Sequence, residues 1–213
     1  MTPLLFWDVD TQVDFMLPEG KLHVPGAETL LPQLAALTQA AHDNGIPVLA
    51  SADDHELGDA EISGPPDFRT TFPPHCLRGT PGVERVPATQ HPEAVEIGHR
   101  ELSAVELAQR LAGGPTSFLV QKKRFDVFSN PNTEPLVAAL APKRIVLYGV
   151  ALDVCDRYAI EGLLARGYAG LELVRDAVKP IRAEEAPDLL ADWQRRGVTL
   201  TTTAAVLASL GAG

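Results

Sequence analysis

Apolar runs with strand character alternate along most of the chain with segments of helical spacing. Between the first two runs, for example, Leu30, Leu34 and Leu37 recur at intervals of three or four residues. This alternation is typical of a parallel sheet covered by helices on both faces. We therefore predict an α/β fold with a doubly wound, Rossmann-like, mostly parallel sheet of about six strands. The predicted strands cover residues 4–9, 46–51, 116–122, 143–150, 170–176 and 197–203.

Size and charge limit the kinds of partner. The chain has 213 residues, of which 45% are hydrophobic, so residues 1–213 can form a single domain around one core. A formal net charge of −10 argues against nucleic acid and anionic membrane surfaces, because both attract clustered Lys and Arg. Asp8 and Asp10 interrupt the first apolar run, so we do not expect it to be a signal peptide or a membrane span. The two cysteines form no dense disulfide framework, which favours a reducing compartment. We expect a cytoplasmic protein that acts on a small molecule; a homo-oligomer is left open.

Three chemically distinct side chains lie at ends of predicted strands, where ligands bind in open parallel sheets. Asp10 follows the first strand, Lys122 ends the third, and Cys155 follows the fourth in the first turn of a helix. The helix N-terminus should lower the pKa of the Cys155 thiol and offer N–H groups to an oxyanion. Alone, each residue also has a structural interpretation: Asp10 as a helix cap, Lys122 as a solvated charge and Cys155 as a small buried hydrophobe. Together, a base, a cation and a nucleophile favour thiolate-mediated amide hydrolysis.

The pair Asp8 and Asp10 also fits a second class, the haloacid-dehalogenase-type phosphatases, in which the first Asp of a D-x-D pair is the nucleophile. That class usually carries Thr or Val where Gln12 stands. It also needs a later acidic pair for magnesium near the last strands, where the sequence offers only Asp176. We therefore interpret Asp8 as a structural carboxylate and Asp10 as a base. A third hypothesis is a non-catalytic binding protein. It predicts that the base, the cation or the nucleophile is missing, and none is.

Five motifs in order resemble the nicotinamidase branch of the isochorismatase-like cysteine hydrolases. They are D-T-Q-V-D-F at 10–15, D-D-H at 53–55, F-P-P-H-C at 72–76, K-K-R-F at 122–125 and G-V-A-L-D-V-C at 149–155. The resemblance covers nearly the whole chain. It implies a catalytic triad of Asp10, Lys122 and Cys155. It also implies a cis peptide between Val150 and Ala151, and an oxyanion hole formed by the N–H groups of Ala151 and Cys155.

The resemblance further implies the reaction. The expected activity is hydrolysis of nicotinamide to nicotinate and ammonia through a Cys thioester, a step of NAD metabolism. Another small amide or a carbamoyl compound is the alternative substrate.

The resemblance also implies a divalent metal ion, Zn, Fe or Mn, beside the triad. Asp53 and His55 lie two apart on an extended segment and so face one side. The Pro-, Gly- and His-rich segment from Glu56 to Pro92 adds His75, and irregular stretches of this kind are usually functional loops. The resemblance implies a fourth ligand at Glu61, where many relatives have His; a carboxylate is a sound ligand in mixed sites.

Three phenylalanines, Phe15, Phe72 and Phe128, are expected to hold an aromatic substrate ring. The sequence departs from the family pattern at two positions nearby. Phe72 stands where some relatives have Trp, and Val154 stands where His precedes the nucleophile. Both changes predict a pocket that differs from the usual one.

Overall fold

Seven parallel strands form one sheet in the computed structural model, which describes residues 4–91 and 93–211. The strand order is β3-β4-β2-β1-β5-β6-β7, and every neighbouring pair is parallel. The bounds are β1 Leu4–Val9, β2 Val48–Asp53, β3 Val95–Ile97, β4 Ser117–Lys122, β5 Arg144–Val150, β6 Leu171–Lys179 and β7 Thr199–Thr201. The predicted α/β class is confirmed. The predicted number of strands was one too low, because the three residues of β3 are too few to show a periodicity.

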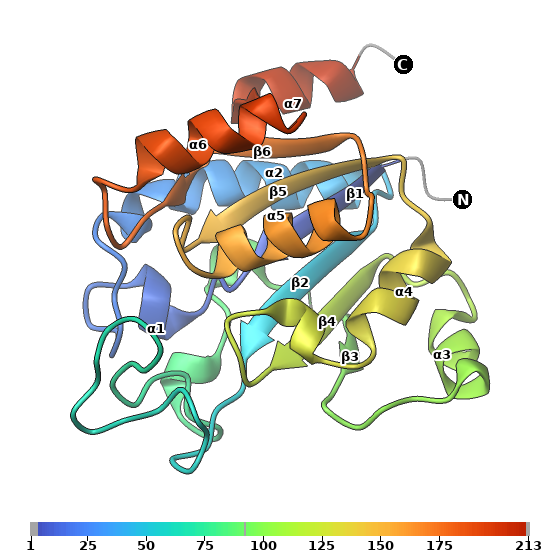
Figure 1. The fold of residues 1–213 in the computed structure, drawn as a ribbon. Coiled ribbons are helices and arrows are strands. Elements are labelled where there is room, and N and C mark those ends of the chain that lie inside the picture. The colour runs from blue at the N-terminus through green and yellow to red at the C-terminus, as the bar shows by residue number, and fades with distance from the viewer. Residues whose placement is uncertain (1–3, 92, 212–213) are drawn as a thin grey trace.

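Helices cover both faces of the sheet (Figure 1). On one face α2 (Leu31–Asp43) contacts α7 (Thr203–Leu210). On the other lie α4 (Thr133–Leu140), α5 (Cys155–Ala165) and α6 (Ala186–Arg195), and Trp193 Nε1 of α6 donates to Glu161 of α5 at 2.9 Å. The remaining helices are α1 Val13–Met16, α3 Ala104–Leu111 and the short 3₁₀ turns η1 Ala27–Leu30, η2 Pro81–Val83, η3 Pro87–Thr89 and η4 Val127–Ser129.

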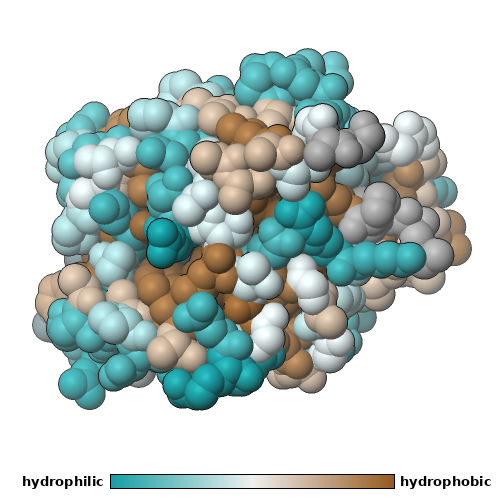
Figure 2. Space-filling view, turned by 90° about the horizontal axis from the view of Figure 1, so that it is seen from above, coloured by the Kyte–Doolittle hydropathy of each residue, from teal (hydrophilic) through white to brown (hydrophobic). Residues whose placement is uncertain are grey.

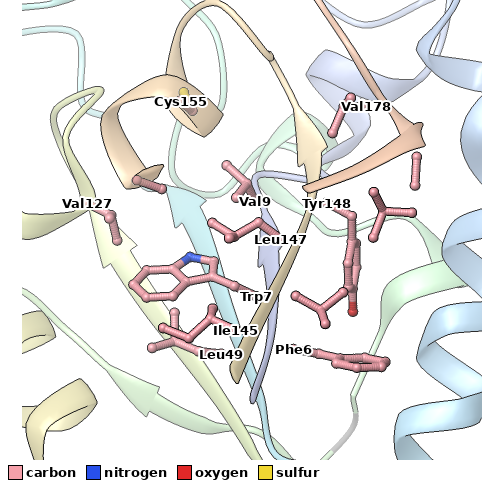
Figure 3. Close-up of a cluster of buried hydrophobic side chains, with 14 of the residues drawn as sticks. Phe6, Trp7, Val9, Leu49, Val127, Ile145, Leu147, Tyr148, Cys155 and Val178 are labelled. Carbon is pink, nitrogen blue, oxygen red and sulfur yellow. The ribbon is translucent and has the colours of Figure 1, made fainter. Parts of the chain in front are cut away.

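The central strands supply most of the core because they are apolar on both sides. Trp7 and Leu147 point toward one helical layer, while Phe6 and Tyr148 point toward the other, with their rings in an edge-on contact at 6.0 Å (Figure 3). All four side chains are fully buried. Such continuous apolar runs are the pattern of strands covered on both faces. The same close-up shows Cys155 at the start of α5, directly above this core.

The sheet order reverses beside β1, and this places a crevice at its carboxyl edge. From β1 the chain crosses to β2 on one side, whereas β5 lies on the other side of β1. Ligands of open α/β sheets bind at this kind of switch point. Gly149, with φ +131°, allows β5 to approach β1 there, since a Cβ atom at this position would overlap the carbonyl of Val9.

The surface mixes polar and apolar residues. Figure 2 shows hydrophobic residues near the middle of one face, with hydrophilic residues around them. Among the described residues, the exposed large hydrophobic side chains are Leu57, Phe68, Val105 and Tyr158. None of the helices in residues 4–91 and 93–211 has the length and apolar character needed to cross a membrane.

Candidate active site

Asp10 lies just beyond the end of β1 and is fully buried. Its backbone adopts φ +48°, which turns the chain out of the sheet while its N–H still donates to Ser51 at 3.2 Å. The Ser51 hydroxyl donates to Asp10 Oδ1 at 2.6 Å, and Lys122 Nζ lies 2.8 Å from Oδ2. The strand end therefore aims a carboxylate into the crevice, and Ser51 and Lys122 hold it there.

Lys122 is the last residue of β4 and is paired across the sheet with Asp53 at the end of β2. Its ammonium group contacts the carboxylates of Asp10 and Asp53 and lies 3.6 Å from Cys155 Sγ. Burial alone would lower the pKa of Lys122, but the two carboxylates raise it well above its usual value. Lys122 is therefore a fixed positive charge between the thiol and two acids.

Cys155 begins α5, as the sequence predicted, but its thiol is in a different charge state from the one we expected. Burial raises the pKa of Cys155 well above its usual value, and the nearby Asp10 carboxylate raises it further. The prediction that the helix N-terminus would lower this pKa was wrong. Burial is the largest cause of this shift, since the side chain is only 7% exposed. A thiol with a raised pKa is neutral and needs a base to ionise it.

The two acids beside Lys122 differ in proton affinity. Burial raises the pKa of Asp10 from its usual value despite the nearby Lys122, and Asp53 raises it further. Burial acts the same way on Asp53, but Lys122, His55 and His75 outweigh it and hold the pKa of Asp53 well below its usual range. Asp10 is thus the better proton acceptor of the pair, and Asp53 stays ionised.

The bond between Val150 and Ala151 is a cis peptide, as the resemblance implied. The segment after it turns back, so that the N–H groups of Val154 and Asp156 donate to the carbonyl of Ala151 at 3.0 and 3.1 Å. Ala151 directly follows β5, and Cys155 is the first residue of α5, so the N–H of Cys155 has no partner within the helix.

Three predicted metal ligands meet at the end of β2. One ligand atom each from Asp53, His55 and His75 lies within 4.8 Å of the others, and all three residues are buried. Nε2 of His55 lies 3.6 Å and Nε2 of His75 lies 3.5 Å from Asp53 Oδ2. The main chain brings them together, since the N–H of His55 donates to the carbonyl of Cys76, the residue after His75, at 3.1 Å.

The unpaired atoms around this group fit a divalent ion. Nε2 of His55 and Oε2 of Glu61 are buried and have no hydrogen-bond partner. Two imidazoles and carboxylates are the donor set that zinc, iron and manganese accept. Glu61 lies outside the close group of three, and its other oxygen accepts from the N–H of Phe125 at 3.0 Å. Burial raises the pKa of Glu61 to about 7.

A narrow, mostly apolar cleft leads to Cys155. Two of the three predicted aromatic residues, Phe15 and Phe72, line it, together with His75 and Ala151. Apolar walls with a few convergent polar groups are typical of small-ligand sites.

Phe128 lies elsewhere, against Trp7 at 6.0 Å and under the guanidinium of Arg166 at 3.9 Å. The third aromatic wall is Phe125, whose ring contacts Phe72 edge-on at 5.6 Å. Phe125 is the last residue of the K-K-R-F motif, and the sequence had predicted no role for it. Its place three residues after Lys122 was the available signal.

The second carboxylate of the first motif points away from the crevice. Asp8 is fully buried and forms an ion pair with Arg85. Burial raises the pKa of Asp8 to about 6, although Arg85 opposes the shift. This arrangement agrees with the interpretation of Asp8 as a structural group.

Comparison with known proteins places this arrangement in a family. The model of the Isochorismatase domain matches residues 4–108 and 97–205. The chain therefore belongs to the isochorismatase-like hydrolases, and within them to the nicotinamidase branch.

Individual relatives agree with this placement. The chain is 29% identical over 195 residues to a nicotinamidase/pyrazinamidase of Mycobacterium tuberculosis, a match that covers 90% of this chain and 95% of the relative. It is 20% identical to a probable inactive nicotinamidase of Arabidopsis thaliana, over 91% of this chain and 89% of the relative. The pyrazinamidase of Pyrococcus horikoshii in complex with zinc has the same fold, with a TM-score of 0.73 and 23% identity over 93% of this chain and 98% of that one.

Proposed function

We propose that this protein is an amidohydrolase that converts nicotinamide to nicotinate and ammonia through a thioester on Cys155. The observation that carries the proposal is the contact of Lys122 with both Asp10 and the Cys155 sulfur, at 2.8 and 3.6 Å. A buried base, cation and thiol in mutual contact suit nucleophilic attack on an amide. The similarity to a nicotinamidase/pyrazinamidase over 90% of the chain supports the substrate class.

The first half of the reaction acylates the thiol. Asp10 accepts the proton of Cys155 as the sulfur attacks the carboxamide carbon, and its raised pKa suits this role. The N–H groups of Ala151 and Cys155 stabilise the oxyanion of the tetrahedral intermediate. Protonated Asp10 then gives its proton to the amide nitrogen, the carbon–nitrogen bond breaks, and ammonia leaves.

The second half regenerates the enzyme. Asp10 takes a proton from a water molecule, whose oxygen attacks the thioester carbon, and the carbon–sulfur bond breaks to release nicotinate. The proton returns from Asp10 to the sulfur. Lys122 keeps its charge throughout, so it stabilises the thiolate as it forms and as it leaves.

Asp53, His55 and His75, with Glu61 nearby, would hold a divalent ion that, when bound, anchors the pyridine nitrogen of the substrate. The apolar walls from Phe15, Phe72 and Phe125 would exclude water from the ring. An ion with this role orients the substrate and leaves the covalent chemistry to the thiol.

An amide panel scored by ammonia release tests the proposal. The panel contains nicotinamide, benzamide and a small carbamoyl compound, and the products are checked for nicotinate. We expect nicotinamide to be turned over fastest by the wild type. Cys155→Ala should be inactive and folded, and Cys76→Ala, which removes the other buried thiol, should remain active. Full activity in Cys155→Ala would refute the proposed nucleophile, and preference for the carbamoyl compound would favour the alternative substrate.

A further inference from the structure

The side chain of Gln12, close in sequence to the base Asp10, binds the main chain of the metal ligand Asp53. The residue is fully buried and stands between Asp10 and α1. Its side-chain amide makes three hydrogen bonds, two of them to the main chain of Asp53. Gln12 Oε1 accepts from the N–H of Asp53 at 2.7 Å, and Nε2 donates to the carbonyl of Asp53 at 2.8 Å. The third bond goes from Nε2 to the carbonyl of Val83 at 2.8 Å.

These bonds replace a backbone pairing that β1 cannot make. The parallel pairing of β1 with β2 runs as far as Val9 and Ser51, and Asp10 then leaves the sheet with φ +48°. Asp53 lies beyond that point and has a strand neighbour only on the β4 side, at Lys122. The Gln12 amide supplies a donor and an acceptor to Asp53 where the next peptide group of β1 would otherwise be. Buried backbone groups need such partners.

Asp53 contacts both the catalytic group around Lys122 and the predicted metal site. One oxygen of its carboxylate contacts Lys122, and the other faces His55 and His75. A shift of its main chain would therefore move one metal ligand and alter the charge around Lys122 in a single step.

We propose that Gln12 is a positioning residue that fixes Asp53 in register with Asp10 and so couples the proton-transfer centre to the metal site. Asp14, two residues on, acts in the same manner on the other ligand segment. Its buried carboxylate accepts from the N–H of Cys76 at 2.6 Å, next to His75. The D-x-Q-x-D stretch thus carries the base and the two side chains that hold the metal-binding main chain. This inference rests on the proposed function for the presence of the metal.

The test measures zinc affinity and nicotinamide kinetics in Gln12→Glu. Glutamate has the same shape but cannot donate to the carbonyls of Asp53 and Val83. Zinc affinity, measured by competition with a chromogenic chelator, should fall by about 10- to 100-fold, the usual effect of losing a group that orients a ligand. The kcat for nicotinamide should fall as well, because a displaced Asp53 disturbs Lys122.

Two further variants serve as a matched control and as a replacement in case Gln12→Glu does not fold. Gln90→Glu is the matched control, because the amide of Gln90 also donates to a main-chain carbonyl, that of Arg85 at 3.0 Å, away from Asp53. It should retain the zinc affinity of the wild type. If Gln12→Glu does not fold, Gln12→Met keeps the length without the charge, and we expect the same loss.

A folded Gln12 variant that binds zinc as tightly as the wild type would overturn the inference and leave the proposed hydrolysis untouched. A wild type that hydrolyses nicotinamide and binds no zinc would also overturn it. A wild type that binds zinc and releases no ammonia would instead refute the proposed function, while the zinc titration of the variants would still decide the role of Gln12.

Discussion

The buried carboxyl group of Asp156 should make the protein less stable as the pH rises. Asp156 is the second residue of α5, it is fully buried, and neither of its oxygens has a hydrogen-bond partner. Burial raises the pKa of Asp156 well above its usual value, and the neighbouring acids Asp10, Asp153 and Asp8 raise it further. The folded protein therefore holds a proton on Asp156 that the unfolded chain releases above about pH 4.

The magnitude follows from this difference in bound protons. Between about pH 4 and the raised pKa, unfolding releases one proton, so the free energy of unfolding falls by about 1.4 kcal/mol for each pH unit from this group alone. Asn has nearly the same shape and no proton to lose. The stability of Asp156→Asn relative to the wild type should therefore grow by about 1.4 kcal/mol between about pH 5 and about pH 6.

Urea unfolding at several pH values measures this difference. Trp7 and Trp193 are both fully buried, so their fluorescence reports unfolding. The titration of Asp8, whose pKa is about 6, is common to both proteins and cancels in the difference. Asp188→Asn, which removes an exposed acid from α6, is the control for the loss of one charge. Curves for Asp156→Asn and wild type that run parallel with pH would refute the reasoning, because they would mean that Asp156 is ionised in the folded protein.

The remaining predictions concern activity. Asp10→Asn should lower kcat by about 10²- to 10⁴-fold, the usual contribution of a general base, and Asp8→Asn should cost far less, since Asp8 pairs with Arg85 away from the thiol. If the order of the two losses were reversed, a phosphatase assay would be the next step. Chelation or Glu61→Ala should lower kcat/KM strongly for nicotinamide and little for benzamide, because benzamide lacks the ring nitrogen. Elemental analysis should find about one divalent ion per chain, as expected for a site with three or four protein ligands; an ion-free protein with unchanged nicotinamide turnover would exclude the metal from the mechanism.

The fold class and the meeting of Asp10, Lys122 and Cys155 could be predicted because they depend on local sequence pattern. Each residue stands at the end of a run whose strand character is visible in the sequence, and the carboxyl ends of parallel strands share one edge. Asp53 also pairs across the sheet with Lys122, which explains the contact between the two. The predicted second strand stopped at residue 51, and the structure extends it to Asp53.

Features that depend on packing were not visible in the sequence. The raised pKa of Cys155 comes from burial by elements distant along the chain, and helix position alone suggested the opposite shift. Phe125 and Phe128 are equally apolar and three residues apart, so only the fold decides which one faces the cavity. The hydrogen bonds of Gln12 depend on the backbone turn at Asp10, where the chain leaves the sheet. No residue pattern in the sequence predicted this turn.

The proposed mechanism requires a thioester between Cys155 and the acyl group of the substrate. Electrospray mass spectrometry of wild-type protein, quenched in acid soon after mixing with nicotinamide, detects such an adduct. We expect a mass increase equal to one nicotinoyl group, which peptide mapping locates on Cys155 and which is absent from Cys155→Ala. Turnover of nicotinamide with no adduct, or an adduct on Cys76, would contradict it.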